Sequence, residues 1–292
     1  SLSLSAAQAT ITASGAPAGR TISGTGSVTV SGLGAGVAML DGITVSGGSL
    51  VARAPASAVL SPLSRLATFT VAVDAGATLT LTAAQTRIAN VQARTFTGTG
   101  WLNLSDTAGA DLSAAQNPVL VNATQNFSAV KLGTNAVLIE APQGASAVLT
   151  LTASQANGRN ITGSGNLVIE GFASVPRADY SQIDVNRASA TVSSNMIFSG
   201  KLGRVGGEFG QFNAPEIELT VPAKVVLTIN GAIASGARID GAGRTILVTG
   251  EIKAANGIDT LTANEALGFF TTNRITTSIE ARVNPGTELE LD

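Results

Sequence analysis

Alternating apolar and polar residues recur along the chain, and each full stretch of alternation ends in the same short polar signature. Three full copies read LSLSAAQ, LTLTAAQ and LTLTASQ, at 2–8, 79–85 and 149–155. Leucines at every second position predict a strand with one buried face. The residues that follow have the form of a capping box, in which a Ser or Thr hydroxyl and a Gln side chain satisfy backbone amides reciprocally. A shorter copy at 112–116 and a drifted copy at 261–265 extend the pattern, so we expect a strand to enter a helical turn repeatedly.

A second motif follows each full copy of the first and begins with an arginine. It has the form of a short strand, a Gly-x-Gly corner and a second alternating strand, and its four copies begin at Arg20, Arg94, Arg159 and Arg238. Glycine at a sharp corner adopts backbone conformations that other residues avoid. A dinucleotide-binding fingerprint would need a third glycine that opens a helix, whereas a strand follows here. The motif therefore indicates a structural corner.

Repeats of about 70 residues predict a stack of similar units. The box glutamine and the arginine that begins the second motif are 12, 9 and 4 positions apart in the three full copies. Such variation is typical of a loop leaving one face of a regular stack. We expect four units, at 1–78, 79–148, 149–225 and 226–292. The predicted fold is all-β: an elongated β-solenoid, parallel β-helix-like, with short helical turns. Tandem β-sandwich repeats are the alternative.

One segment, 172–212, departs from the repeat pattern and is expected to be an irregular aromatic and Gly-rich insertion in the third unit. Five of the eleven aromatic residues of the chain lie in it: Phe172, Tyr180, Phe198, Phe209 and Phe212. One interpretation makes these side chains a contact surface, since binding residues concentrate in loops. The other is a loop that tucks its own rings onto the stack.

Composition narrows the chemistry open to this chain. It has no cysteine and no histidine, which excludes disulfides, thiolate or imidazole metal ligands and every mechanism with a histidine base. Lys and Arg total 17 against 19 Asp and Glu, and a net charge of −2 provides no basic surface for nucleic acid or an anionic membrane. No apolar run reaches the ~18 residues of a membrane span. A mean hydropathy of +0.32 argues against disorder.

The strand and box motif, the Gly-x-Gly corner and an Ala-Asp-Leu-Ser element at 110–113, with relatives at 178–183 and 40–43, together resemble the repeats of very large bacterial extracellular β-strand-repeat proteins. The resemblance covers nearly the whole chain and is weakest at 185–225 and 270–292. It implies a secreted structural protein of an S-layer, an adhesin or a biofilm matrix, and such proteins often carry calcium-binding repeats. This sequence has no calcium-binding nonapeptide and no EF-hand loop, so no cofactor is expected. Whether the scattered Asp41, Asp111 and Asp179 bind a divalent metal stays open.

Two sets of charged residues are candidates for binding or chemistry. The four arginines recur in register and could form a ladder that binds an acidic polymer such as an anionic polysaccharide. Alternatively, each arginine caps the preceding helical turn or pairs with a local acid. Glu216 and Glu218 lie ~6.5–7 Å apart on one strand face, near the carboxylate separation of inverting glycosidases. A solvated edge strand is the simpler interpretation of that pair, so no catalytic residue is assigned and no enzyme activity is expected.

The expected function is structural. Exposed strand edges on an apolar, weakly charged solenoid favour end-to-end addition of another copy, which would build a filament or lattice at the bacterial cell surface or in the extracellular matrix. The alternative is a polysaccharide-binding module of a large adhesin, with the arginine ladder or 172–212 as its site. The expected partners are therefore other copies of the chain or a cell-surface polysaccharide.

Overall fold

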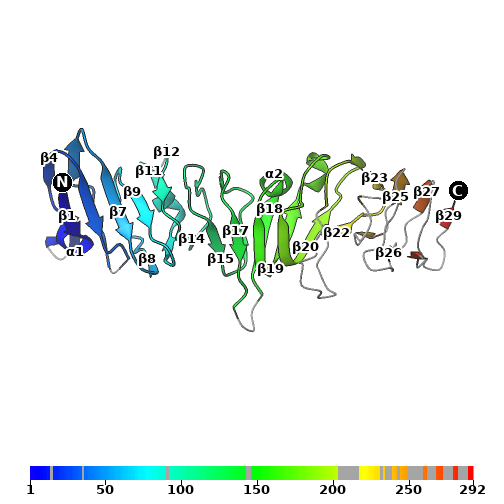
Figure 1. Ribbon diagram of the computed structural model, residues 1–292, viewed down its shortest axis with the longest axis horizontal. Helices are drawn as coiled ribbons and strands as arrows, with labels where there is room; N and C mark the ends of the chain where they lie inside the picture. The colour runs from blue at the N-terminus through cyan, green and yellow to red at the C-terminus, as the bar shows by residue number, and fades with distance from the viewer. Residues whose placement is uncertain are drawn as a thin grey trace. The chain divides into compact units, whose positions relative to one another are not determined.

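The computed structural model is a β-solenoid in which parallel strands stack in about 8 turns, here called coils (Figure 1). It describes residues 1–13, 16–34, 36–89, 92–142, 146–202, 217–230 and 233, and the short segments 239–241, 244–248, 259–261, 268–271, 279–281 and 289–291. Strands of successive coils pair in parallel, as in the register Leu79↔Leu102. The all-β solenoid prediction is confirmed. The sandwich alternative is wrong, because a sandwich is built from antiparallel sheets.

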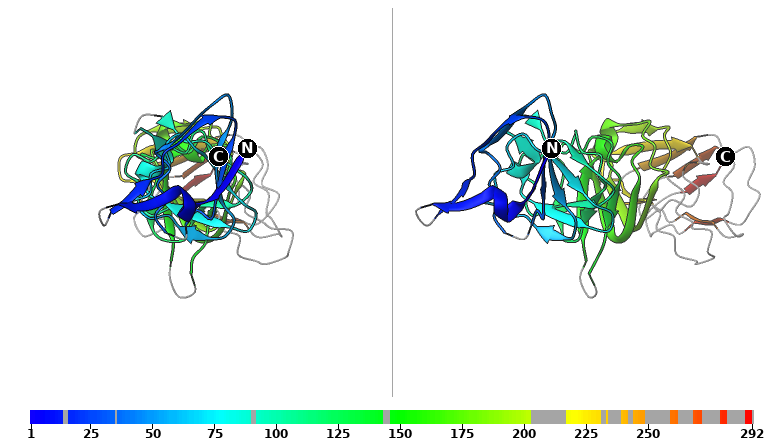
Figure 2. Two further views of the ribbon diagram at one scale, coloured as in Figure 1. Left: turned by 90° about the vertical axis from the view of Figure 1, so that its left-hand side faces the viewer. Right: turned by 60° about the vertical axis from the view of Figure 1, so that its left-hand side comes forward.

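The chain divides into two compact units, and the first comprises Ser1–Val121 with Ala129–Leu138. Its elements are β1 (Leu2–Ser5), α1 (Ala6–Ala9), β2 (Thr10–Ala13), β3 (Ala16–Gly19), β4 (Ile22–Thr25), β5 (Val28–Ser31), β6 (Ile43–Ser46), β7 (Leu50–Ala54), β8 (Ala58–Val59), β9 (Thr70–Val73), β10 (Thr78–Leu81), η1 (Ala83–Thr86), β11 (Arg87–Ile88), β12 (Gln92–Ala93), β13 (Phe96–Thr97), β14 (Trp101–Leu104) and β15 (Val119–Val121). One parallel sheet has the order β1-β5-β7-β9-β13, a second contains β8, β10, β14 and β15, and β4 pairs with β6. Two antiparallel hairpins, β2–β3 and β11–β12, leave this stack, and the dark blue β2–β3 hairpin extends away from the strands (Figure 2).

The second unit comprises Asn122–Ser128 with Ile139–Asp292. Its elements are β16 (Gln125–Asn126), β18 (Val148–Thr152), α2 (Ala153–Ala156), β19 (Ile161–Glu170), η2 (Phe172–Ser174), β20 (Ile183–Thr191), β21 (Met196–Phe198), β22 (Ile217–Thr220), β23 (Val226–Asn230), β24 (Ile239–Asp240), β25 (Arg244–Val248), β26 (Asp259–Leu261), β27 (Gly268–Thr271), β28 (Ile279–Ala281) and β29 (Leu289–Leu291), while β17 (Val137–Ile139) has residues in both units. One sheet contains β16-β18-β19-β20-β22-β24, another has the order β21-β23-β25-β27-β29, and β26 pairs with β28. The helical turns named here have three or four residues, well short of the ~20 of a bilayer-spanning helix.

The alternation in the sequence produces a thin aliphatic core. Leu79 and Leu81 of β10 are 0% and 1% exposed, whereas Thr80 and Thr82 are only partly covered. The same pattern repeats in β18, where Leu149 is fully buried. Successive side chains of a strand point to opposite faces, so each coil buries one row of aliphatic groups against the next coil. Stacking therefore provides the core that no coil could build alone.

The Gly-x-Gly corners are places where two coils approach closely. Gly98 has a φ of 93°, and a Cβ at this position would lie 2.2 Å from the carbonyl oxygen of Val73 in the preceding coil. Gly163 has a φ of 126°, and its Cβ would lie 2.1 Å from the carbonyl oxygen of Ile139. Both the backbone conformation and the contact require glycine. The corner interpretation of this motif is confirmed.

The aromatic residues of 172–202 form the one bulky cluster of the second unit's described core. Phe172, Tyr180 and Phe198 are 0–1% exposed, and their ring centroids lie 5.0–6.5 Å apart in stacked geometry. The interpretation of these three as a contact surface is wrong, because the rings are packed inside the coils. The segment is also more regular than expected, since β20 is a nine-residue strand within it. Phe209 and Phe212 lie outside the described residues.

Burial of this cluster makes a stability prediction with an adjacent control. Phe198→Ala removes a fully buried ring from the stack and should lower the free energy of unfolding by about 3–5 kcal/mol. Ile197 precedes it on β21 and is 68% exposed, so Ile197→Ala should change the same quantity by less than about 0.5 kcal/mol. Urea denaturation followed by circular dichroism measures both. Equal losses would contradict the buried placement of Phe198.

Candidate functional site

The three full box sequences form the expected helical turns. In each, the Ser or Thr hydroxyl accepts a hydrogen bond from the backbone N–H of the Gln. The side-chain oxygen of the Gln accepts one from the backbone N–H of the Ser or Thr. The pairs are Ser5/Gln8, Thr82/Gln85 and Thr152/Gln155. The prediction at these positions is confirmed. At 113–116 it is wrong, because the Ser113 hydroxyl donates to Asp111 at 2.6 Å and no helical turn forms. The drifted copy at 262–265 lies outside the described residues.

The box glutamine also connects neighbouring coils. The Nε2 of Gln85 donates to the carbonyl oxygen of Ser61 at 2.7 Å, and the Nε2 of Gln155 donates to that of Phe127 at 2.7 Å. Each acceptor lies one coil earlier in the chain. A single side chain therefore completes the helical turn with its oxygen and holds the preceding coil with its nitrogen.

The recurrent arginine closes the loop that follows each box. Its Nε donates to the backbone carbonyl of the box glutamine: Arg20 to Gln8 at 2.8 Å, Arg94 to Gln85 at 2.9 Å and Arg159 to Gln155 at 2.6 Å. The intervening loops contain β2–β3 in the first case, β11–β12 in the second and a tight turn in the third. The prediction that each arginine caps the preceding helical turn is confirmed for these three, and Arg238 lies outside the described residues.

Arg94 shows the fullest form of this contact. Its Nη1 donates to the carbonyl oxygens of Leu66, Ala67 and Phe69 in the preceding coil, and its Nη2 donates to that of Arg87. The side chain is 3% exposed, and desolvation lowers its pKa to about 10, which leaves it charged at neutral pH. All these donors bind main chain, so Arg94 is not available to a polysaccharide.

The prediction of a surface-exposed arginine ladder is therefore wrong for Arg94, its second member. Arg159 is partly buried, and desolvation lowers its pKa as well. Arg20 is exposed. We call the box glutamine, the recurrent arginine and the first glycine of the corner the coil clamp, since each contacts main-chain carbonyl groups of the preceding coil in the second repeat.

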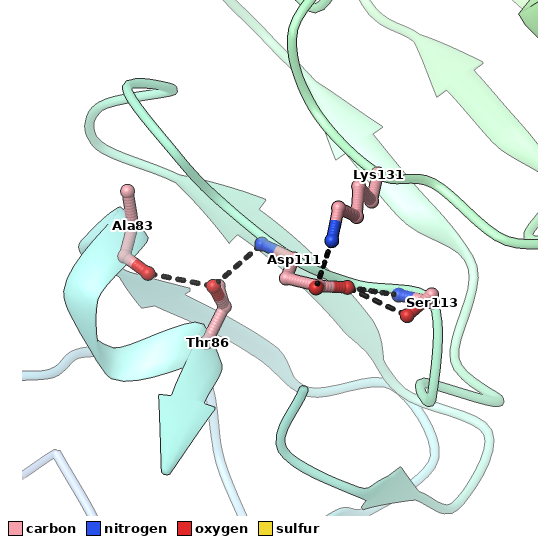
Figure 3. A network of polar contacts seen from close by, with 5 residues as sticks. All are labelled: Ala83, Thr86, Asp111, Ser113 and Lys131. Carbon is pink, nitrogen blue, oxygen red and sulfur yellow. Dashed lines mark hydrogen bonds and ion pairs between the residues drawn. The ribbon is translucent and has the colours of Figure 1, made fainter. Parts of the chain in front are cut away.

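The aspartates form a separate set of links toward the following coil. Figure 3 shows Asp111, whose carboxylate accepts hydrogen bonds from the Ser113 amide and hydroxyl and pairs with Lys131 at 3.3 Å. Its own amide donates to the hydroxyl of Thr86, which donates to Ala83. Asp179 repeats the arrangement with Ser181 and Lys201, and Asp41 pairs with Arg65 at 3.2 Å.

These environments explain the pKa directions of two aspartates. Burial would raise the pKa of Asp111, but hydrogen bonds from Ser113 and the charge of Lys131 outweigh it and hold the pKa below its usual value. Hydrogen bonds from Lys201 and Ser181 lower the pKa of Asp179 to about 2. Each carboxylate is thus already paired with a basic residue. In the described part of the chain, no three acidic side chains gather as metal ligands.

Of the two carboxylates Glu216 and Glu218, the structure describes only Glu218. Glu218 on β22 forms an ion pair with Arg187 of the neighbouring strand β20, while Glu216 lies outside the described residues. The Glu218 side chain is 14% exposed, and β22 lies between β20 and β24, so the prediction of a solvated edge strand is wrong for this residue.

Two buried asparagines that bind main-chain carbonyl groups were not predicted from the sequence. Nδ2 of Asn117 donates to the carbonyls of the Gly98–Gly100 corner, including Gly100 at 2.9 Å, and Nδ2 of Asn135 donates to Asn117 at 2.7 Å. They are 0% and 5% exposed. A detectable signal was present, because NPVLV at 117–121 and NAVLI at 135–139 repeat at a spacing of one short coil.

The buried clamp arginine can be compared with its exposed counterpart. Arg94→Lys leaves at least one of five carbonyl groups without a donor and should lower the free energy of unfolding by about 1.5–3 kcal/mol. Arg20→Lys can keep the one bond to Gln8 and should cost less than about 0.5 kcal/mol. Urea titrations of the two variants test this, and similar losses would refute a special role for Arg94.

The Asp179 network predicts a pH dependence. Because its folded-state pKa is about 2, below the ordinary 3.8, the ionised carboxylate stabilises the fold above about pH 4, and this contribution is lost as the pH falls through 2. Asp179→Asn should lower Tm at pH 7, and the gap from wild type should shrink toward pH 2. The exposed Asp184→Asn controls for loss of one negative charge. A gap that is constant with pH would contradict the assignment.

Comparison with known proteins leaves the family open. No protein-family model matches this chain, no curated protein is significantly similar to it, and no solved structure matches its fold at a significant level. The resemblance to bacterial β-strand-repeat proteins thus rests on the sequence motifs alone.

Proposed function

We propose that the chain is a non-enzymatic structural protein of the bacterial cell surface or extracellular matrix, acting by self-association in an S-layer, a fibre or an adhesin stalk. One observation carries the proposal: the polar side chains that recur in the repeats bind main-chain carbonyl groups of a neighbouring coil. Gln85 and Arg94 do so together in the second repeat. A repeat whose recurrent polar groups serve stacking is suited to building an extended structure.

The parallel stacking of coils supports association with further copies. Successive coils add through the same kind of parallel strand pairing, as in the registers Val28↔Leu50 and Leu79↔Leu102. Coils that stack in this repetitive way are suited to extension of the same stack. Location outside the cell is proposed from the resemblance of the motifs.

The test is the concentration dependence of the purified full chain. Sedimentation velocity at increasing micromolar concentrations, with negative-stain electron microscopy of the same samples, should reveal uniform filaments or a lattice. Association through strands and apolar groups should persist in 1 M NaCl, where the Debye length is only ~3 Å, while charge-driven clumps should dissolve. The samples are repeated with calcium. A chain that remains monomeric under all these conditions would overturn self-association.

A further inference from the structure

One sheet of the first unit has an outer face without a charged side chain. Its strands lie side by side in the order β8, β10, β14, β15 and β17 (Figure 1). The inward leucines and valines of β10, β14, β15 and β17 are 0–2% exposed, and the residues that alternate with them point outward. These outward positions within 57–61, 78–82, 101–105, 118–120 and 136–138 carry Ser, Thr, Asn, Ala, Val, Leu, Pro and Trp only.

The single tryptophan of the chain lies in the middle of this face. Trp101 begins β14 and is partly exposed, while the next residue, Leu102, is fully buried. Thr78 is its partner in the parallel register on one side. Pro118 lies on the other side, because the Leu102 amide donates to the Pro118 carbonyl oxygen. The indole is therefore the largest side chain of its row and has small neighbours on both sides.

Uncharged polar groups surround the indole. Thr78 and Thr80 are partly exposed, and in the part of the chain that the structure describes their hydroxyl groups have no hydrogen-bond partner. The same holds for the N–H of the Trp101 ring. The hydroxyl of Ser57 is exposed and accepts a hydrogen bond from the Thr78 amide at 2.9 Å. Since a hydroxyl can both donate and accept, the face offers both kinds of bond around an apolar plate.

This combination selects the chemistry of a ligand. A charged ligand would lose hydration here and find no opposite charge, since the basic residues of the first unit that carry ion pairs bind Asp41, Asp74 and Asp111 instead. A purely apolar ligand would leave the threonine hydroxyls without partners. A neutral sugar satisfies both requirements: the C–H groups on one side of a pyranose ring pack on an indole, and its hydroxyls point outward to the rim.

The spacing of the coils favours a polymer over a single sugar. Val59, Thr80 and Asn103 are register partners on β8, β10 and β14, so they form a second row beside that of Trp101. Neighbouring strands lie about 4.8 Å apart, close to the length of one sugar ring, so consecutive sugars can lie over consecutive coils. Val59 is 68% exposed and offers a further apolar contact, whereas Asn103 is only 4% exposed and is covered by its neighbours.

We propose that this outer face binds a neutral polysaccharide, with one sugar ring stacked on Trp101 and its hydroxyls bound by Thr78 and Thr80. We call Ser57, Val59, Thr78, Thr80 and Trp101 the tryptophan face. The inference does not depend on the proposed self-association. It gives the expected polysaccharide partner a neutral chemistry and a site separate from the recurrent arginines and from 172–212.

The single tryptophan makes the site directly measurable. Its fluorescence reports on this face alone, so the full chain is titrated with four neutral polymers: hydroxyethyl cellulose, laminarin, dextran and galactomannan. A stacked sugar excludes water from the indole, and at least one polymer should shift the emission to shorter wavelength. The carboxymethylated form of that polymer adds negative charges and should bind more weakly.

Native gels that contain the bound polymer test the residues. Trp101→Ala should lower the affinity about 10-fold or more, whereas Trp101→Phe keeps a flat ring and should retain part of it. Thr80→Val keeps the shape but removes the hydroxyl and should weaken binding. Ile197→Ala removes a 68% exposed apolar side chain from the second unit and should bind like wild type. Tm is measured for each variant, and if Trp101→Ala does not fold, Thr80→Val and Trp101→Phe carry the test.

The outcomes separate this inference from the proposed function. If none of the four polymers changes the fluorescence or retards the wild type, or if Trp101→Ala binds equally well, the tryptophan face is wrong. If the emission changes with protein concentration alone and Trp101→Ala abolishes association, the face is a contact between copies, so the inference is wrong and self-association stands. A chain that binds a polymer but stays monomeric supports the inference and contradicts self-association.

Discussion

The coils that begin with the second and third box motifs are held by main-chain carbonyl groups of the coil before them. Ladder hydrogen bonds satisfy carbonyls within the parallel sheets, but the bends between strands leave others without partners, and buried carbonyls need donors. The coil clamp supplies two of these donors, the side-chain amide of Gln85 and the guanidinium group of Arg94. Gly98 has no side chain that would collide with the Val73 carbonyl, which accepts a hydrogen bond from the Gly100 amide. The aliphatic core can stay thin because polar contacts fix the positions of the bends.

This dependence explains which parts of the structure follow from the sequence. Capping boxes and glycine corners are local devices, encoded within a few residues, and they were predicted where the motif is complete. The predicted capping box at 113–116 does not form, and the reason lies outside its own residues. The Ser113 hydroxyl donates to the carboxylate of Asp111, two positions earlier, and this charge-assisted hydrogen bond is stronger than a bond to a neutral group. Local patterns predict local structure until a neighbouring charge competes.

The remaining errors concern contacts between coils. The sequence does not reveal the register between neighbouring coils, so it does not show that Arg94 binds the carbonyl groups of Ala67 and Phe69. For this reason the recurrent arginines were interpreted as a binding ladder. It also does not show that the rings of Phe172 and Phe198 meet in one core, so an aromatic cluster looked like a surface. The coil length varies along the chain, and this variation hides which residues become neighbours.

The arginine-closed loops have a consequence for how such a chain can change. Between Gln85 and Arg94 the chain leaves the stack as the β11–β12 hairpin, and the bond from Arg94 to Gln85 joins the two ends of the excursion. Between Gln155 and Arg159 the same bond spans only a tight turn. Lengthening a loop whose ends are already fixed costs little, because closure entropy grows only with the logarithm of length. These two loops, and the β2–β3 loop that the bond from Arg20 to Gln8 closes, are therefore sites where an evolving gene or a protein engineer could insert a peptide epitope or a small domain into the solenoid.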